Sequence, residues 1–399
     1  MTNEEIRQQA DMLKDYVIRC RRKVHEFAEP SGTEEQTSAF VRKEMEDLGL
    51  PYERVSATGL MAVLDTGRPG PHMALRADMD ALSVPESREN LTGPRTCLSK
   101  NPATCHACGH DAHTAMLLGA MKALKAKEDR LRGVFYFCFE EGEEDGRGVA
   151  DMLKALGRRK VDTVWAIHVY AGLPSGTICV DPGPRMAGAA GVELTVVGKG
   201  GHGSRPDMAV NPVMCAAAIL TNVAMAWVNQ ITAGETVTLG VTSIRGGDTG
   251  NVIPDTAAIK GSLRFFNIEE GRKAVEVFKQ VAEHTAAMNR CAVEFGPRFK
   301  ALCGPVINDK RYAAIAREAL LEILGEECVV SGEPWYASES FSRWLAAYPG
   351  VFAHLGTKNP EKGFGAAHHN SRFDVDEEVL SLGLTATLKY VDAVQKKYE

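Results

Sequence analysis

Residues 134–148 read VFYFCFEEGEEDGRG, and this stretch decides the fold. Its first six residues are apolar, as in a buried strand, and carboxylates follow at once, from Glu140 to Asp145. A helical pattern comes next, from Gly148 to Leu156. Strands that alternate with helices predict an α/β domain with a largely parallel sheet, in which sites form at the carboxyl ends of the strands.

The same alternation extends to both sides of this stretch. Apolar runs at 60–64, 72–75 and 163–167 predict strands, and residues 4–27, 34–48 and 114–126 predict helices. Thr33 occupies the position of a helix cap, and 60–65 with 72–78 form a hairpin-like pair. From residue 191 the order becomes strand, helix, strand, strand, helix, strand, which is typical of a split βαβ module.

Stretches rich in Gly and Pro at 181–191 and 299–305 flank this module and predict two hinges. We therefore expect an α/β catalytic domain built from residues 1–185 and 300–399, with a mixed, mostly parallel sheet flanked by helices. Residues 186–299 form the inserted domain, with a ferredoxin-like α+β fold. A chain of 399 residues is long enough for two cores.

Composition excludes several classes of protein. The proportions of 44% hydrophobic and 25% charged residues are those of a globular protein. The formal net charge is −6 and the chain has no basic tract, so we expect no nucleic-acid or membrane partner. The charged N-terminus does not resemble a signal peptide, and no apolar stretch approaches the roughly 20 residues of a membrane helix. Ten scattered cysteines favour reduced thiols, so we expect a cytoplasmic location.

The sequence CHACGHDAH, residues 105–113, is the densest group of candidate ligands. Two cysteines, three histidines and an aspartate in nine residues indicate metal binding. Cys108 and His110 are two apart, so on extended chain both side chains point to one side. Cys105 and Cys108 also form a C-x-x-C pair, which leaves open a structural zinc site or a redox pair.

Further candidates follow predicted strands at the same sheet edge. Adjacent Glu143 and Glu144 allow one carboxylate to bind a metal while the other serves as a general base. His168 ends a strand, and one of the consecutive residues His368 and His369 is expected in the site; Asp78 and Asp80 also follow a strand. Thiolate, imidazole and carboxylate donors together suit zinc, cobalt, nickel or manganese.

These motifs resemble a family of dinuclear metal amidohydrolases. The family includes hippurate hydrolases, N-acyl-amino-acid amidohydrolases and indole-3-acetyl-amino-acid hydrolases, in the clan of aminoacylase and carboxypeptidase G2. The resemblance covers nearly the whole chain, and its motifs fall in the family's order: RRKVHEFAEP, RADMDAL, HACGHDAHTAMLLGA, GEEDGRG, HV, GKGGHGSRPDMAVNP, GNVIPDTA, GSLRF, HLGT and HHNSRFDVDEE. It implies a zinc-peptidase-like catalytic domain and an inserted domain that is a lid and a homodimer surface.

The resemblance also assigns roles to residues. It implies two divalent transition-metal ions (Zn, Mn, Co or Ni) held by Cys108, which bridges them, and by His110, Glu144, His168 and His369. Glu143 falls on the family's general base. His202 falls on a histidine that holds the scissile carbonyl, Asn251 and Arg264 on positions that bind substrate, and Asp80 and His113 on residues that orient ligands.

The implied reaction is hydrolysis of the amide bond of N-acyl or N-aroyl amino acids by a metal-activated water. A dipeptidase, carboxypeptidase or N-deacetylase on the same dinuclear site is an alternative, and so is a non-catalytic zinc module formed by Cys97, Cys105, Cys108 and a histidine. Two departures bear on specificity: Glu140-Glu141-Gly142 replaces the family's Q-P-A, and Glu339-Ser340-Phe341 replaces its E-D-F.

Overall fold

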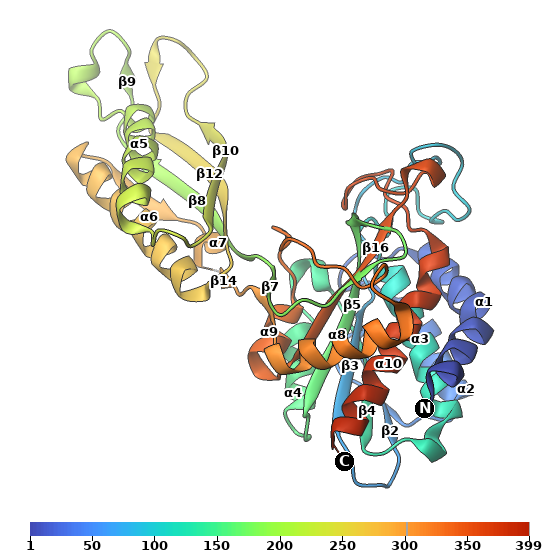
Figure 1. Ribbon diagram of the computed structural model, residues 1–399. Helices are drawn as coiled ribbons and strands as arrows, with labels where there is room; N and C mark the ends of the chain where they lie inside the picture. Colours follow the sequence, from blue (N-terminus) through green and yellow to red (C-terminus); the bar gives the residue numbers. More distant parts are fainter. Residues whose placement is uncertain (301, 399) are drawn as a thin grey trace. The chain divides into compact units, whose positions relative to one another are not determined.

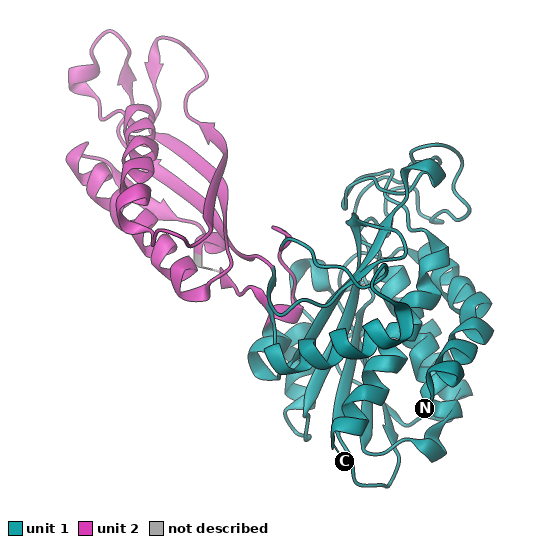
Figure 2. Ribbon diagram, viewed as in Figure 1, with its two compact units in different colours: residues 1–185, 307–333, 343–399 teal, residues 186–306, 334–342 magenta. Residues whose placement is uncertain are grey.

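The computed structural model describes residues 1–300 and 302–398, and the chain divides into two compact units (Figures 1 and 2). Unit 1 comprises Met1–Arg185, Ile307–Glu333 and Arg343–Glu399, and unit 2 comprises Met186–Val306 and Pro334–Ser342. The segment Pro334–Ser342, which the sequence places in the catalytic domain, belongs to unit 2. Ala301, inside the second predicted hinge, lies outside the described residues.

Unit 1 is built on a seven-stranded mixed sheet in the order β1-β2-β4-β3-β5-β16-β6. The four central strands run parallel, and β1, β2 and β6 pair antiparallel at the edges. The strands are β1 (Tyr52–Arg54), β2 (Leu60–Asp65), β3 (His72–Asp78), β4 (Val134–Glu140), β5 (Thr163–Pro174), β6 (Ile178–Cys179) and β16 (Gly350–Lys358).

The predicted hairpin of β2 with β3 is wrong, because β4 lies between these strands. All seven residues of β4 are buried, so this strand needs a partner on each edge and a layer of side chains on each face. It pairs antiparallel with β2 and parallel with β3. The six-residue connection from β2 to β3 therefore passes over one strand position.

Helices pack against this sheet, as in Figure 1: α1 (Asn3–Phe27), α2 (Glu35–Asp47), α3 (His110–Ala126), α4 (Val149–Leu156), α8 (Lys310–Leu324) and α10 (Leu380–Tyr398). A short helix, α9 (Phe341–Ala347), spans the boundary between the units. The cap predicted at Thr33 is wrong: its hydroxyl donates to the Pro30 carbonyl, and the carboxylate of Glu29 accepts from the first amides of α2. Trp165 of β5 stacks on Tyr390 of α10 in the core.

The register of the parallel strands brings three site residues to one level. Asp78 at the end of β3 pairs with Glu140 at the end of β4. Arg76 pairs with Ala166 of β5, so His168 lies level with Asp78. The carboxyl ends of β3 and β4 thus lie level with His168. The prediction that His168 ends its strand is wrong, because β5 continues to Pro174.

Unit 2 contains an antiparallel sheet in the order β10-β12-β8-β13, with β14 also paired to β8. Its elements are β8 (Gly188–Val197), β9 (Gly201–His202), α5 (Pro212–Gln230), β10 (Val237–Arg245), β11 (Val252–Ile253), β12 (Thr256–Phe265), α6 (Ile268–Met288), β13 (Ala292–Phe295), α7 (Pro297–Lys300) and β14 (Leu302–Cys303). Burial alternates strictly along β8, and its inward side chains form a core with α5 and α6. This is the split βαβ order that the sequence predicts.

Helix α5 corrects one expectation from the sequence. With 19 residues, it is long and apolar enough to cross a membrane by length and composition. One face of the helix instead packs into the core of unit 2 through Cys215, Ile219 and Val223. The opposite face leaves Met214, Met225 and Val228 exposed.

Candidate metal centre

Two candidate ligands of unit 1 lie where a loop meets α3: Cys108 is in the loop, and His110 is the first residue of the helix. Helix α3 begins at His110, four residues earlier than predicted, and Gly109 before it is not extended but left-handed, with φ of 89°. A Cβ on Gly109 would lie 2.2 Å from a methyl of Val169, so only glycine fits this turn. Cys108, His110 and His168 offer ligand atoms within 4.8 Å of one another.

The carboxylate of Asp80 connects both ligand-bearing segments. Its Oδ1 accepts from His110 Nδ1 at 3.1 Å and from the amide of Glu143 at 3.1 Å. Its Oδ2 accepts from the amide of Glu144 at 3.1 Å and from the Ser31 hydroxyl at 2.6 Å. Asp80 therefore fixes the imidazole of His110 and the turn that carries the two glutamates.

His168 has the tautomer that a metal ligand needs. Its Nδ1 lies 2.6 Å from the carbonyl of Val169, which can only accept, so Nδ1 carries the proton. Burial, with a further contribution from His113, lowers the pKa of His168 well below its ordinary value and keeps the ring neutral. Nε2 thus carries a lone pair, 3.6 Å from Cys108 Sγ.

His113 is not oriented as a ligand. Its Nε2 accepts from the amide of Val169 at 2.9 Å, and its Nδ1 donates to Asp78 Oδ1 at 2.6 Å. Both ring nitrogens are used, which fits a residue that positions others. Asp78 lies 3.7 Å from His110 Nε2 and 2.7 Å from Arg76, so the buried Arg76, which we did not predict, compensates its charge.

Of the two consecutive histidines, His369 enters the cluster. Its Nε2 lies 3.3 Å from Glu144 Oε1, and Cys108, Glu144 and His369 form a second group of ligand atoms within 4.8 Å. His368 Nε2 instead accepts from the amide of Ala171 at 3.1 Å. His369 has φ of 63°, a left-handed conformation that a non-glycine residue rarely adopts, and such strain is common at ligand sites.

Two buried atoms of this cluster show that its residues fit a metal ion. His110 Nε2 and Glu144 Oε1 are buried, lie 3.9 Å apart and have no hydrogen-bond partner among the described residues. Burial opposes a charge on His110, but the Asp78 carboxylate and the thiolate form of Cys108 outweigh it and raise the pKa of His110 well above its ordinary value. A divalent cation would replace that proton and satisfy both atoms.

The other acidic residues of the 140–145 stretch have partners outside the cluster. Glu140 accepts from Arg76 Nη2 at 2.8 Å and from Trp344 Nε1 at 2.6 Å. Glu141 accepts from the Ser56 hydroxyl and from the amide of Thr58. The acidic change from the family's pattern is therefore satisfied by hydrogen bonds within unit 1.

The zinc module with Cys97 and Cys105 is not supported. Cys97 Sγ contacts the carbonyl of Arg22 at 3.4 Å, and burial raises the pKa of the Cys105 thiol to about 12. Among the described residues, neither cysteine belongs to a group of ligand atoms close enough to hold a metal. Cys108 shares its groups with histidines and Glu144 instead.

The predicted substrate residues all belong to unit 2. His202 in β9 is exposed, and its Nδ1 accepts from the amide and the hydroxyl of Ser204 at 3.1 and 2.7 Å. Asn251 lies beside it, since its carbonyl accepts from the amide of Gly203. Arg264 in β12 has a buried Nη1 with no hydrogen-bond partner among the described residues, and burial lowers its pKa.

Comparison with known proteins identifies the class. The model of peptidase family M20/M25/M40 matches residues 74–393, and the chain belongs to this family. It is therefore a metallohydrolase that acts on amide bonds.

Similar proteins agree with this class. The chain is 34% identical over 372 residues to an IAA-amino acid hydrolase, ILR1-like 4, of Arabidopsis thaliana (92% of this chain, 83% of the relative). It is 32% identical over 371 residues to an N-acetylcysteine deacetylase of Bacillus subtilis strain 168 (92% and 93%). Among solved structures, a dinuclear metal-binding peptidase of the M20 family from Bacillus subtilis has a TM-score of 0.81 and 29% identity, covering 97% of this chain and 99% of that one.

Proposed function

We propose that this chain hydrolyses the amide bond of N-acyl or N-aroyl amino acids at a dinuclear metal site. The observation that carries the proposal is the convergence, at one sheet edge, of thiol, imidazole and carboxylate groups, including two buried atoms that make no hydrogen bond among the described residues. The relatives support the substrate class, since the names of both describe hydrolysis of an acyl group from an amino acid.

The proposed ligands divide into two sets that share Cys108. One set adds His110 and His168, and the other adds Glu144 and His369. This mixture of donors suits Zn, Mn, Co or Ni. When bound, the ions supply Lewis-acid polarisation of the scissile carbonyl and lower the pKa of the attacking water.

Glu143 is the proposed general base. Its side chain, His110 and Glu144 offer atoms within 4.8 Å of one another, and its amide is fixed by Asp80. In the proposed mechanism, the carboxylate of Glu143 takes the proton of the attacking water. It then donates this proton to the leaving amine as the carbon–nitrogen bond breaks.

His202 is the proposed donor to the carbonyl oxygen. Because Ser204 donates an amide hydrogen to Nδ1, the neutral ring carries its proton on Nε2, which can hydrogen-bond to the developing negative charge. Arg264 is the proposed partner of the substrate carboxylate, because its unpartnered guanidinium nitrogen matches an anion.

We also propose a homodimer in which His202 acts on the partner's metal site. Arg264 pairs with Ala189, and Thr256, eight residues away on the same strand, pairs with Val197. Eight residues of strand span about 27 Å. Strand β9, which contains His202, lies beyond the end of β8 (Figure 1), whereas an N-acyl amino acid is about three residues long, or about 10 Å. One chain therefore cannot place both side chains on the same substrate.

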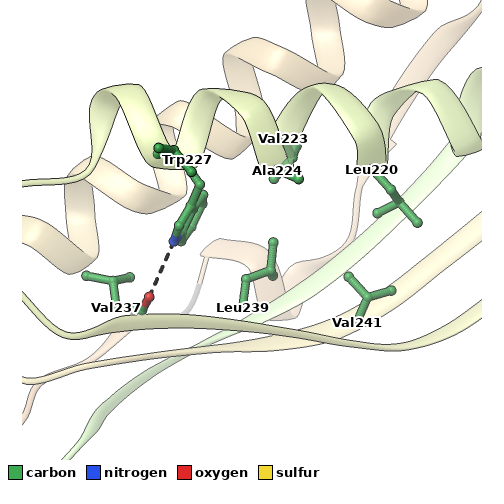
Figure 3. Close-up of a pocket in the computed structure, with 8 residues that line it drawn as sticks. Leu220, Val223, Ala224, Trp227, Val237, Leu239 and Val241 are labelled. Carbon is green, nitrogen blue, oxygen red and sulfur yellow. Dashed lines mark hydrogen bonds between the residues drawn. The ribbon is translucent and has the colours of Figure 1, made fainter.

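The surface of unit 2 supports this dimer. Strand β10 is an edge of the sheet, and Val241 and Ile244 on it are exposed. Between β10 and α5 lies an apolar hollow of about 560 Å³, closed at one end by Trp227, whose Nε1 donates to the carbonyl of Val237 (Figure 3). Val228 at this rim is 84% exposed. An unpaired edge strand beside exposed apolar side chains is a surface that a second copy would cover.

The test of the reaction uses the metal-free protein reloaded with Zn²⁺ or Mn²⁺. N-benzoyl, indole-3-acetyl and N-acetyl amino acids are compared with dipeptides, and faster release from dipeptides would favour the peptidase alternative. Glu143→Ala should keep both metals and lose about 10²- to 10⁴-fold in turnover. Asp145→Ala in the same turn, whose exposed carboxylate pairs with Arg147, is the matched control. Unchanged turnover in Glu143→Ala would refute the base assignment.

We also propose a cytoplasmic location. All ten cysteines are free thiols in the structure, as expected of a protein from a reducing compartment.

A further inference from the structure

The segment 85–105, between β3 and α3, has no part in the reaction described above, yet it contains a buried pair of charges. The side chains of Glu86 and Arg95 are 3% and 1% exposed, and Arg95 Nη1 donates to Glu86 Oε1 at 3.2 Å. Glu86 Oε2 also accepts from the amide of Ser99 at 2.6 Å. The segment therefore has a fixed ionic centre.

Arg95 reaches out of this segment to the loop of a proposed metal ligand. Its Nη2 donates to the carbonyl of Ser371 at 2.8 Å, and the amide of Ser87 donates to the same carbonyl at 3.0 Å. Ser371 is two residues after His369. The bond from Arg95 is the stronger of the two, because its donor is charged.

His369 depends on such support. Its backbone is left-handed, and its side chain is 52% exposed, so little packing holds it in place. Before the strained residue, the loop is held by the bond from the His369 amide to the carbonyl of Ala107 at 2.9 Å. After it, the bonds from Arg95 and Ser87 to Ser371 hold the loop.

The same ionic centre connects to the other ligand segment. His25 Nε2 lies 2.7 Å from Glu86, and His25 Nδ1 lies 2.7 Å from Asp111, the residue after His110. A continuous chain of buried polar groups thus joins the start of α3 to the loop of His369.

We propose that Arg95 is a positioning residue that holds the His369 loop in its ligating conformation. This inference rests on the proposed assignment of His369 as a metal ligand. Arg95 bonds directly to the His369 loop but reaches the start of α3 only through Glu86, His25 and Asp111. Its loss should therefore weaken the ion held by Cys108, Glu144 and His369 more than the ion held by Cys108, His110 and His168.

The experiment measures two metal dissociation constants for the full-length, metal-free protein by competition between Zn²⁺ and a chromophoric chelator. Arg95→Gln should weaken one constant by about 10- to 100-fold and change the other by much less. Excess Zn²⁺ should then restore turnover. Arg88→Gln is the matched control, because Arg88 is exposed in the same segment and the change removes the same charge. It should leave both constants unchanged.

We call the hold of Arg95 on the His369 loop the clamp. The possible outcomes distinguish a failure of the clamp from a failure of the proposed function. A wild type that binds no second ion overturns the ligand assignment and the clamp with it. A wild type with two ions, together with an Arg95→Gln variant that has both constants unchanged or both equally weakened, overturns the clamp alone. Should Arg95→Gln fail to fold, Arg95→Lys keeps the charge but loses the planar fork, and it should show a smaller loss at the same single constant.

Discussion

Two inactive variants of this enzyme should restore activity to each other when they share a dimer. One variant is Glu143→Ala, which lacks the proposed base, and the other is His202→Ala, which lacks the proposed donor to the carbonyl. Each homodimer should be strongly impaired, since a missing base costs about 10²- to 10⁴-fold and a missing oxyanion donor about 10²- to 10³-fold.

The size of the recovery follows from the separation of His202 and Arg264 along the sheet of unit 2. If His202 acts on the partner's site, a mixed dimer contains one site with both Glu143 and His202 and one site with neither. Random pairing puts about half of the molecules in mixed dimers, so about one quarter of wild-type turnover should return. If His202 acts within its own chain, every site in the mixed dimer lacks one group.

The assay co-expresses the variants with two different affinity tags and isolates the mixed dimer by sequential purification. The purified mixed dimer should then have about half of wild-type turnover, since one of its two sites is complete. Homodimers of each variant, purified in the same way, are the controls. A pure mixed dimer with no more activity than its parents would refute the argument from distance.

Three further predictions concern the metal centre. Asp80→Ala removes the acceptor of His110 and of two backbone amides, so metal affinity should fall about 10- to 100-fold in a chelator competition, and unchanged affinity would contradict this. Gly109→Ala places a Cβ 2.2 Å from Val169 at a positive φ. The free energy of unfolding, measured in urea, should therefore fall by about 2 to 4 kcal/mol. A fall of less than about 0.5 kcal/mol would show that the turn relaxes and would contradict this reasoning. Burial lowers the pKa of His106 to about 4, below its unfolded value, so this group makes the metal-free protein lose stability as pH falls from about 6.5 to 4. His106→Phe should remove about 3 kcal/mol of that loss, and parallel pH profiles of wild type and variant would oppose the assignment.

Much of the fold was predictable because the strands of unit 1 are apolar on both faces. The all-buried run that became β4 and the alternating pattern of β8 define their element types without tertiary information. The order of the strands was not predictable from the same runs. The predicted hairpin of β2 with β3 is wrong because nothing in the local pattern shows that a later strand, β4 (Val134–Glu140), inserts between them.

The candidate site was predictable where candidate residues follow strands: Asp80 and Glu144 come after β3 and β4, which share a carboxyl edge. His168 joins them from within β5, which extends to Pro174, beyond the apolar run seen in the sequence. Other features required the folded chain. The pairing of Arg76 with Glu140 and the glycine turn before His110, which packs against Val169, depend on neighbours distant in sequence.

The partners of the acidic stretch have a consequence for how substrates meet the site. Five carboxylates occur within six residues, but Glu140 shares the charge of Arg76 with Asp78, and Asp145 pairs with Arg147. An approaching anionic substrate therefore encounters an electric field set chiefly by Glu141, Glu143 and Glu144, together with the metal cations when these are bound. Counting charges along the polypeptide overstates the repulsion that a free amino-acid carboxylate would meet on entry.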